Sequence, residues 1–233
     1  MNPAGSFPNG QLLFTPEQLH AKFGDAKLTI LDVRPTHELI RHGWVPGAAH
    51  FDLYGIGTTQ TKPELFEEWI TMMRSLSALR GVSMEQTVVI YEETSGMRAA
   101  RLFWVLEYLG HQDVHVLDGG FGAWRAAGLP VSRDMREPKA RSFKAQPRAE
   151  LFISADELNR RLREPGLSIL DTRSDDEYYS RQVRSARGGA IPGAVHLEWT
   201  NYLDESGRFK PNLELLALFT SCGIRPENAI VPY

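Results

Sequence analysis

The stretch LTILDVRPTHELIRHGWVPGAAHFD (residues 28–52) decides the fold, because a related stretch follows about 140 residues later. The second copy is LSILDTRSDDEYYSRQVRSARGGAIPGAVHLEW (residues 167–199). In each copy a short apolar run ends in aspartate, which is typical of a buried strand in a parallel sheet. A repeat of this length predicts two similar domains rather than a solenoid of short units.

The sequences on both sides of these stretches repeat as well. A capping box, in which a hydroxyl residue is followed three positions later by an acid or amide, precedes each copy at Thr15 and Ser154. GVSMEQTVVIY (residues 81–91) aligns without a gap on GIRPENAIVPY (residues 223–233). Strands therefore alternate with helices, and we expect an α/β protein of two domains, each a mainly parallel sheet flanked by helices.

The repeat also sets the expected domain boundaries. We predict an N-terminal domain over residues 1–131 and a C-terminal domain over residues 151–233. The second domain is expected to be incomplete here, because everything after residue 91 of the first copy lacks a counterpart. Residues 132–150 are polar and rich in lysine and arginine, which predicts a solvated linker. A basic patch that steers a substrate is the alternative for this segment.

Composition excludes several classes of function. The 233 residues are 42% hydrophobic and carry a net charge of −3, a globular profile in which nothing favours a nucleic-acid partner. No run approaches the roughly 18 apolar residues of a membrane helix, and residues 1–19 lack a secretory leader. The one cysteine, Cys222, excludes an internal disulfide, and the seven histidines lack metal-site spacing. We therefore expect a monomeric cytoplasmic protein without metal, cofactor or membrane contact.

Short motifs recur in a fixed order along nearly the whole chain. LDVR (31–34) and LDTR (170–173) open the two copies, VPGAAHFD (45–52) and IPGAVHLEW (191–199) follow, and DGGFGAW (118–124) closes the first. In this order the motifs resemble the rhodanese superfamily, specifically its tandem-domain thiosulfate and 3-mercaptopyruvate sulfurtransferases. The resemblance implies transfer of a sulfane sulfur from a small anionic donor to a thiophilic acceptor such as cyanide.

The resemblance also implies where catalysis takes place. In the family a cysteine directly follows the strand represented here by residues 88–91 and 230–233, and its thiolate carries the sulfur as a persulfide. Glu92 occupies that place in the first domain, which is therefore expected to be non-catalytic. In the second domain we expect the nucleophile directly after Tyr233, outside this sequence. The 233 residues alone are accordingly expected to be inactive.

Three residues of the second copy are candidates for a substrate pocket. Arg173 ends a strand at the edge where ligands of open α/β sheets gather. The resemblance implies that Trp199 faces the catalytic loop, and Tyr233 immediately precedes the expected nucleophile. The alternative for Arg173 is an internal ion pair that fastens the loops, because the first domain has the same D-x-R pattern without a cysteine.

Other residues are weaker candidates. Cys222 lies at the end of a helix expected over residues 213–221, before the strand rather than after it, so we expect a packing role. Arg181, Arg184 and Arg187 lie in an insertion specific to the second copy, where they would either attract an anionic donor or remain solvated. The alternative function is a non-catalytic rhodanese-like binding or regulatory protein. The choice between thiosulfate and 3-mercaptopyruvate stays open.

Overall fold

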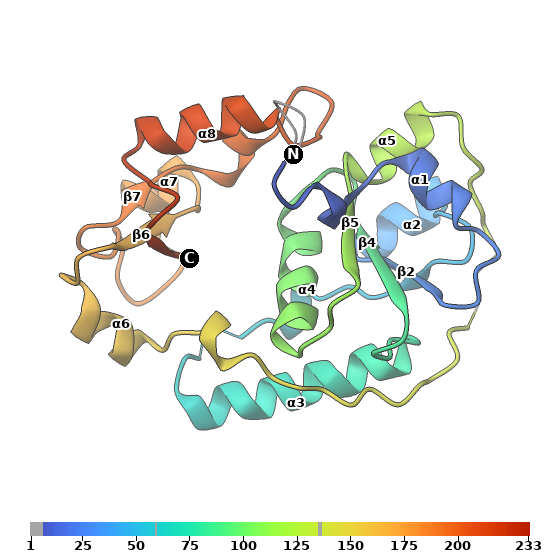
Figure 1. The fold of residues 1–233 in the computed structure, drawn as a ribbon, viewed down its shortest axis with the longest axis horizontal. Helices are drawn as coiled ribbons and strands as arrows, with labels where there is room; N and C mark the ends of the chain where they lie inside the picture. Colours follow the sequence, from blue (N-terminus) through green and yellow to red (C-terminus); the bar gives the residue numbers. More distant parts are fainter. Residues whose placement is uncertain (1–6, 59, 135–136) are drawn as a thin grey trace. The chain divides into compact units, whose positions relative to one another are not determined.

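The computed structural model describes residues 7–58, 60–134 and 137–233, and the chain forms two compact units (Figure 1). The N-terminal unit comprises residues 9–152 together with residues 205–209. The C-terminal unit comprises residues 153–204 and 210–233, joined by Phe7 and Pro8. By sequence position residues 205–209 belong to the second repeat, yet they pack with the first unit.

Within the described residues, the N-terminal unit is built on a five-stranded parallel sheet in the order β1-β5-β4-β2-β3. Its strands are β1 (Leu13–Phe14), β2 (Leu28–Asp32), β3 (Ala49–His50), β4 (Thr87–Tyr91) and β5 (Val114–Leu117). Successive residues of β2 and β4 point to opposite faces of the sheet. Leu31 and Ile90 are buried in one core, and Ile30 and Val89 in the other. Burial on both faces explains the continuous apolar runs.

Helices cover both faces of this sheet (Figure 1). Phe66 and Leu102, from α3 (Pro63–Leu79) and α4 (Met97–Tyr108), pack in the larger core with Leu31. Leu19 and Trp124, from α1 (Pro16–Ala21) and α5 (Gly120–Ala126), pack in the smaller core. The remaining elements of the unit are η1 (Gly10–Leu12), η2 (Tyr54–Ile56), α2 (Thr36–His42) and η3 (Ala149–Leu151).

The capping box predicted at Thr15 is formed. The Gln18 N–H donates to Thr15 Oγ1 at 3.3 Å, and the Thr15 N–H donates to Gln18 Oε1 at 2.8 Å. At Ser154 the prediction is only half right: the Glu157 N–H donates to Ser154 Oγ at 3.2 Å. The Glu157 carboxylate instead accepts a bond from Arg161 at 3.3 Å, because one helical turn separates the two side chains.

The segment expected as a linker over residues 132–150 runs against the N-terminal unit. Most of its described residues are exposed, but Phe143 is 6% exposed and packs in the larger core. Beyond the segment, Phe152 stacks on Phe66 with ring centres 3.7 Å apart. Backbone hydrogen bonds also attach residues 132–150 to the N-terminal unit, since the Gln146 N–H donates to Leu109 O at 2.9 Å. The compact unit therefore continues past residue 131 to Phe152.

The C-terminal unit repeats the beginning of this architecture. In the described residues its sheet is three-stranded and parallel, in the order β7-β6-β8. Its core is small and is centred on Leu170, Leu197 and Ile224. Its elements are α6 (Ala155–Arg161), β6 (Leu167–Asp171), α7 (Asp175–Tyr178), β7 (Val195–His196), η4 (Trp199–Tyr202), α8 (Asn212–Ser221) and β8 (Ala229–Pro232). The prediction of two α/β domains with parallel sheets flanked by helices is confirmed.

Candidate functional site

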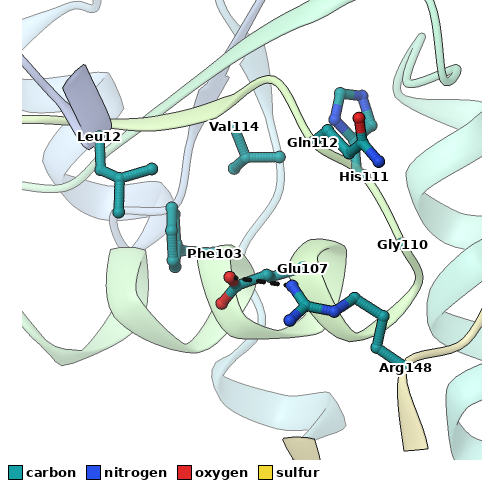
Figure 2. A pocket seen from close by; sticks show the side chains of 8 residues that line it. All are labelled: Leu12, Phe103, Glu107, Gly110, His111, Gln112, Val114 and Arg148. Carbon is teal, nitrogen blue, oxygen red and sulfur yellow. Dashed lines mark hydrogen bonds and ion pairs between the residues drawn. The ribbon is translucent and has the colours of Figure 1, made fainter. Parts of the chain in front are cut away.

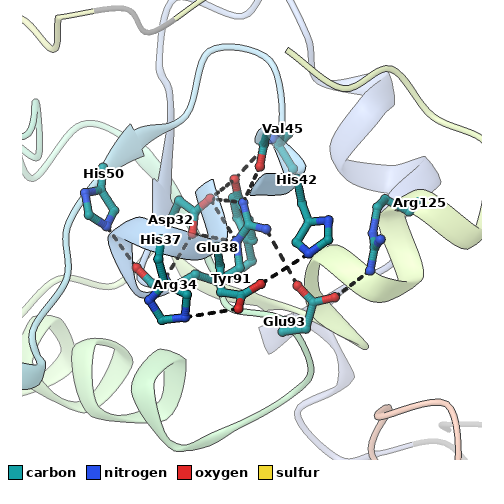
Figure 3. Close-up of polar contacts among 11 residues, drawn as sticks. Asp32, Arg34, His37, Glu38, His42, Val45, His50, Tyr91, Glu93 and Arg125 are labelled. Atoms are coloured by element: carbon teal, nitrogen blue, oxygen red, sulfur yellow. Dashed lines mark hydrogen bonds and ion pairs between the residues drawn. The ribbon is translucent and has the colours of Figure 1, made fainter. Parts of the chain in front are cut away.

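Polar side chains meet at the carboxyl ends of β2 and β4 in the N-terminal unit (Figure 3). The parallel register places Asp32, the last residue of β2, beside Tyr91, the last residue of β4. The Tyr91 hydroxyl donates to Asp32 Oδ2 at 2.6 Å. Arg34 donates to the same carboxylate through Nη2 at 2.6 Å and Nε at 3.0 Å, and Nη2 also reaches Gly43 O at 2.7 Å. Two strand ends and the loop after α2 are thereby joined.

Burial sets the electrostatics of this network. The Arg34 side chain is 1% exposed and lies 3.8 Å from the ring centre of Phe121. Burial alone would lower the pKa of Arg34, but hydrogen bonds and the charge of Asp32 outweigh it and raise the pKa. Burial, followed by the charge of Asp32, raises the pKa of Tyr91 well above its usual value. Arg34 is therefore a cation and Tyr91 a neutral donor, as a compensated buried charge requires.

The C-terminal unit contains the same network. Arg173 donates to Asp171 through Nε at 3.0 Å and Nη2 at 2.5 Å, and Nη2 reaches Gly189 O at 2.8 Å. The Ile191 N–H donates to the Tyr233 hydroxyl at 2.9 Å, as the Val45 N–H does to that of Tyr91 at 3.1 Å. Burial raises the pKa of Tyr233, and hydrogen bonding to Asp171 adds to it. Arg173 differs from Arg34 in being 29% exposed.

Both remaining pocket candidates connect to Arg173 through one threonine. The backbone N–H of Trp199 donates to Thr172 O at 3.1 Å. The backbone N–H and the hydroxyl of Thr172 donate to Tyr233 O at 3.0 and 2.9 Å. The guanidinium of Arg173 lies 5.0 Å from the ring centre of Tyr233. The half-buried Trp199 starts η4 at this edge of the sheet. Arg173, Trp199 and Tyr233 are thus gathered at the carboxyl ends of β6 and β8.

The arginines of the insertion lie at the surface of the same unit. Arg181 pairs with Asp176 at 2.6 Å and Arg184 with Glu177 at 3.4 Å, so each of the two arginines has an acidic partner. Arg187 is exposed. His196 lies 2.8 Å from Asp175 through Nε2 and stacks on Tyr178. These two contacts hold the imidazole ring of His196 in place.

Glu92 lies in the loop after β4 of the N-terminal unit. Its Oε1 accepts bonds from the backbone N–H groups of Arg98 at 2.7 Å and Ala99 at 3.0 Å, at the start of α4. Burial raises the pKa of Glu92, and these two N–H groups oppose the shift. The loop backbone is fixed by α5, because the Phe121 N–H donates to Glu92 O at 2.7 Å. Gly120 is required at this approach, since a Cβ there would overlap Glu92 O.

A profile of the rhodanese-like domain matches residues 15–127 and 154–231. The chain belongs to the rhodanese family. The match comprises two separate domains: the first span contains Asp32, Arg34 and Tyr91, and the second contains Asp171 and Arg173 and ends two residues before Tyr233. The expected family membership is therefore confirmed.

Relatives of this rhodanese are named as sulfurtransferases. It is 30% identical over 227 residues to the thiosulfate sulfurtransferase of Azotobacter vinelandii, covering 97% of this chain and 83% of the relative. It is 32% identical over 240 residues to the probable 3-mercaptopyruvate sulfurtransferase of Pseudomonas aeruginosa, covering 95% and 83%. These two relatives carry names with different sulfur donors.

Solved structures give the same fold. The 3-mercaptopyruvate sulfurtransferase SseA from Escherichia coli superposes with a TM-score of 0.79 at 25% identity, covering 95% of this chain and 87% of SseA. The anaerobic ergothioneine biosynthesis enzyme from Chlorobium limicola has a TM-score of 0.79 at 21% identity, covering 97% of this chain and 61% of that enzyme. The second likeness extends to the fold alone.

Cys222 of this rhodanese follows the last turn of α8. Its backbone is the C-cap, and its half-buried side chain packs against the core that contains Leu170 and Ile224. It precedes β8, as the sequence predicts. Burial, with a smaller contribution from Cys222, raises the pKa of the neighbouring Tyr202 to about 12.

A cavity of about 240 Å³ lies at the opposite end of the N-terminal sheet (Figure 2). Two pairs of polar groups lie in it: Arg148 with Glu107 at 3.3 Å, and His111 Nε2 with Ser83 O at 2.9 Å. Burial lowers the pKa of His111. Ligands of parallel sheets gather at the carboxyl ends of strands, so this cavity is a poor candidate site. Its lining residues are Leu12, Phe103, Glu107, Gly110, His111, Gln112, Val114 and Arg148.

Within the described part of the chain, no three or more His, Cys, Asp or Glu side chains are grouped so as to hold a metal ion. Over the same residues, no helix has the length and apolarity needed to cross a membrane.

The sequence analysis predicts Tyr233 as a pocket residue but misses Tyr91, and it misses the hydrogen-bonding role of both tyrosines. Tyr91 and Tyr233 end equivalent strands, and both aligned segments close on tyrosine. That shared residue was the available signal, because a buried tyrosine hydroxyl needs a partner. The carbonyls of Gly43 and Gly189, which accept from the two arginines, leave no comparable mark in the sequence.

Proposed function

We propose that this rhodanese is a sulfurtransferase that moves a sulfane sulfur from thiosulfate or 3-mercaptopyruvate to a thiophilic acceptor such as cyanide. The observation that carries the proposal is the gathering of Arg173, Trp199 and Tyr233 at one edge of the C-terminal sheet. Similarity to relatives named as sulfurtransferases supports it. As part of the proposal, the protein acts as a cytoplasmic monomer.

The proposed chemistry has two steps. A cysteine thiolate, at the position directly after Tyr233, attacks the outer sulfur of thiosulfate; the sulfur–sulfur bond of the donor breaks, and sulfite leaves with the bonding electrons. Cyanide then attacks the terminal sulfur of the persulfide, thiocyanate leaves, and the thiolate is restored. No external oxidant or reductant is consumed. A thiolate is required because a thiol at its ordinary pKa is mostly protonated at neutral pH.

The proposed pocket residues act on the charge and shape of the donor. Arg173 is partly exposed and keeps its positive charge, because its bonds to Asp171 raise its pKa. It is the proposed contact for the anionic end of the donor. Trp199 and Tyr233 are proposed to form walls of the substrate pocket. Arg181, Arg184 and Arg187 are proposed only to raise the local concentration of anions.

In the proposal the N-terminal unit takes no part in the chemistry. Glu92 stands where the nucleophile would stand, and a carboxylate cannot carry a persulfide. Its carboxylate also occupies the N–H groups of Arg98 and Ala99 at the start of α4. Those are donors of the kind that would stabilise a thiolate in an active loop.

The test is a thiocyanate assay of the protein expressed from its full reading frame. Cyanide is supplied with thiosulfate or with 3-mercaptopyruvate, and the intact mass is measured after donor alone. We expect thiocyanate with at least one donor and a mass increase of one sulfur atom. Absence of both would overturn the proposal in favour of a non-catalytic binding or regulatory protein. Transfer that disappears in Cys222→Ser would move the nucleophile to Cys222.

A further inference from the structure

Residues Glu205–Phe209, which we call the strap, pack with the N-terminal unit although the residues on both sides belong to the C-terminal unit. The strap lies on the loop between β4 and α4, the loop that contains Glu92. The Ser95 N–H donates to Gly207 O at 2.8 Å. Two residues further along the strap, the Phe209 N–H donates to Asp118 Oδ1 at 3.0 Å. The β4–α4 loop, through Ser95, and the turn after β5, through Asp118, thus engage a carbonyl and an N–H of the strap backbone.

Ser95 and Asp118, which contact the strap, are also hydrogen-bonded to each other. The Ser95 hydroxyl donates to Asp118 Oδ1 at 2.9 Å and accepts from the Gly119 N–H at 2.7 Å. Ser95 is 4% exposed, so this geometry is held within the unit. Arg208 adds its charge, with Nη1 3.9 Å from Asp118 Oδ2. The acceptor for the strap, Asp118 Oδ1, and the donor, the Ser95 N–H, are therefore preorganised at a fixed spacing.

Gly207 of the strap lies close to the loop. It is buried and has a φ of +76°, in the left-handed region that favours glycine. A Cβ at this position would lie 2.6 Å from Thr94 Cγ2 and 2.8 Å from Thr94 Cβ. Any larger residue would therefore be strained and would also push the strap away from the loop.

We propose that the β4–α4 loop and the neighbouring Asp118 of the N-terminal rhodanese unit form a docking site for the strap, which they recognise through Gly207 and through two backbone groups two residues apart. The strap accepts a hydrogen bond from the Ser95 N–H, and the Glu92 carboxylate accepts those from the N–H groups of Arg98 and Ala99. Donors with which the loop would bind an external anion are thus used within the chain. The first repeat serves to hold a segment of the second. This role is independent of the proposed sulfur transfer.

Amide hydrogen exchange of the full chain tests the docking directly. We expect the Ser95 and Phe209 amides of the wild type to be protected, because each donates a hydrogen bond in the docked strap. In Gly207→Ala we expect both to exchange about tenfold faster or more, with the amides of β4 unchanged. Wild-type Ser95 and Phe209 amides that exchange as fast as an unstructured peptide would overturn the proposal without any variant.

Matched variants separate docking from backbone strain. Gly128→Ala is the control, because Gly128 lies in the same unit with φ +67° and no atom within 4 Å of an added Cβ. It should leave the Ser95 and Phe209 amides protected. Thr94→Gly combined with Gly207→Ala removes the contact, and should restore part of the protection even if the single variant folds poorly. If Gly207→Ala and Gly128→Ala behave alike, the loop does not recognise the strap.

Discussion

Oε1 of Glu92 lies 2.7 Å from the backbone nitrogen of Arg98, in the first turn of α4. A carboxylate is therefore placed where the positive end of the helix dipole favours negative charge. The same carboxyl is largely removed from water, and burial makes the larger contribution to its raised pKa. The two influences oppose each other, and their balance can be measured through pH.

Replacing Glu92 by glutamine should reveal a pH-dependent cost of the carboxylate. Because the folded-state pKa is raised, the protonated wild type is favoured at low pH, and folding becomes less favourable as the group ionises. Glu92→Gln should match the wild type at about pH 4 and gain relative stability towards about pH 7. Thermal unfolding across this range is the measurement. Glu68→Gln, at an exposed residue, is the control. The expectation would be contradicted if the wild type became more stable relative to Glu92→Gln as the pH rises.

Removing the Tyr91 hydroxyl should destabilise the N-terminal unit. Tyr91→Phe leaves Asp32 with one partner fewer and the Val45 N–H without its acceptor. A buried polar group left unpaired costs about 1–3 kcal/mol, so we expect a loss of that size in denaturant unfolding. Tyr108→Phe is the matched control, because Tyr108 is 8% exposed and its raised pKa comes from burial and the charge of Glu67 rather than from a hydrogen bond. Equal losses in the two variants would show that the network contributes nothing.

The sequence predicts the strands well and their connections less well. Residues 28–32 and 167–171 read as buried strands because both faces of a parallel sheet are covered, which forces continuous apolar runs. The D-x-R pairs and the place of Glu92 follow from the repeat. The strap could not be predicted, because it docks through backbone groups of Gly207 and Phe209. The linker interpretation missed that one aromatic residue, Phe143, anchors an otherwise polar segment.

Phe143 should therefore behave as a core residue. Truncation of a buried phenylalanine costs about 3–5 kcal/mol, and we expect Phe143→Ala to lower the free energy of unfolding of the N-terminal unit by about 3 kcal/mol. Val131→Ala, at a residue that is 42% exposed, should change it by about 0.5 kcal/mol or less. Urea unfolding followed by tryptophan fluorescence distinguishes the two. A loss below about 1 kcal/mol for Phe143→Ala would mean that the segment is only loosely attached.

Cys222 should be dispensable for sulfur transfer. It caps α8 and packs beside Leu170 and Ile224, on the amino-terminal side of β8. Cys222→Ser should cost about 1 kcal/mol through the loss of a small apolar contact and should leave the rate of thiocyanate formation unchanged. The assay is run beside a melting curve, so that loss of fold is not mistaken for loss of chemistry.

Arg173 and Arg34 make the same contacts but differ in exposure, and this difference predicts different consequences of substitution. Lysine lacks the planar fork that reaches both the aspartate and a glycine carbonyl, so Arg34→Lys and Arg173→Lys should both lower stability. Arg34 is 1% exposed and out of reach of a donor, whereas Arg173 is 29% exposed. If Arg173 contacts the donor, Arg173→Lys should also raise the KM for thiosulfate about tenfold, while Arg34→Lys leaves it unchanged. Steady-state kinetics below the melting temperature of each variant make the comparison. An unchanged KM in Arg173→Lys would leave this arginine with the structural role that Arg34 already has.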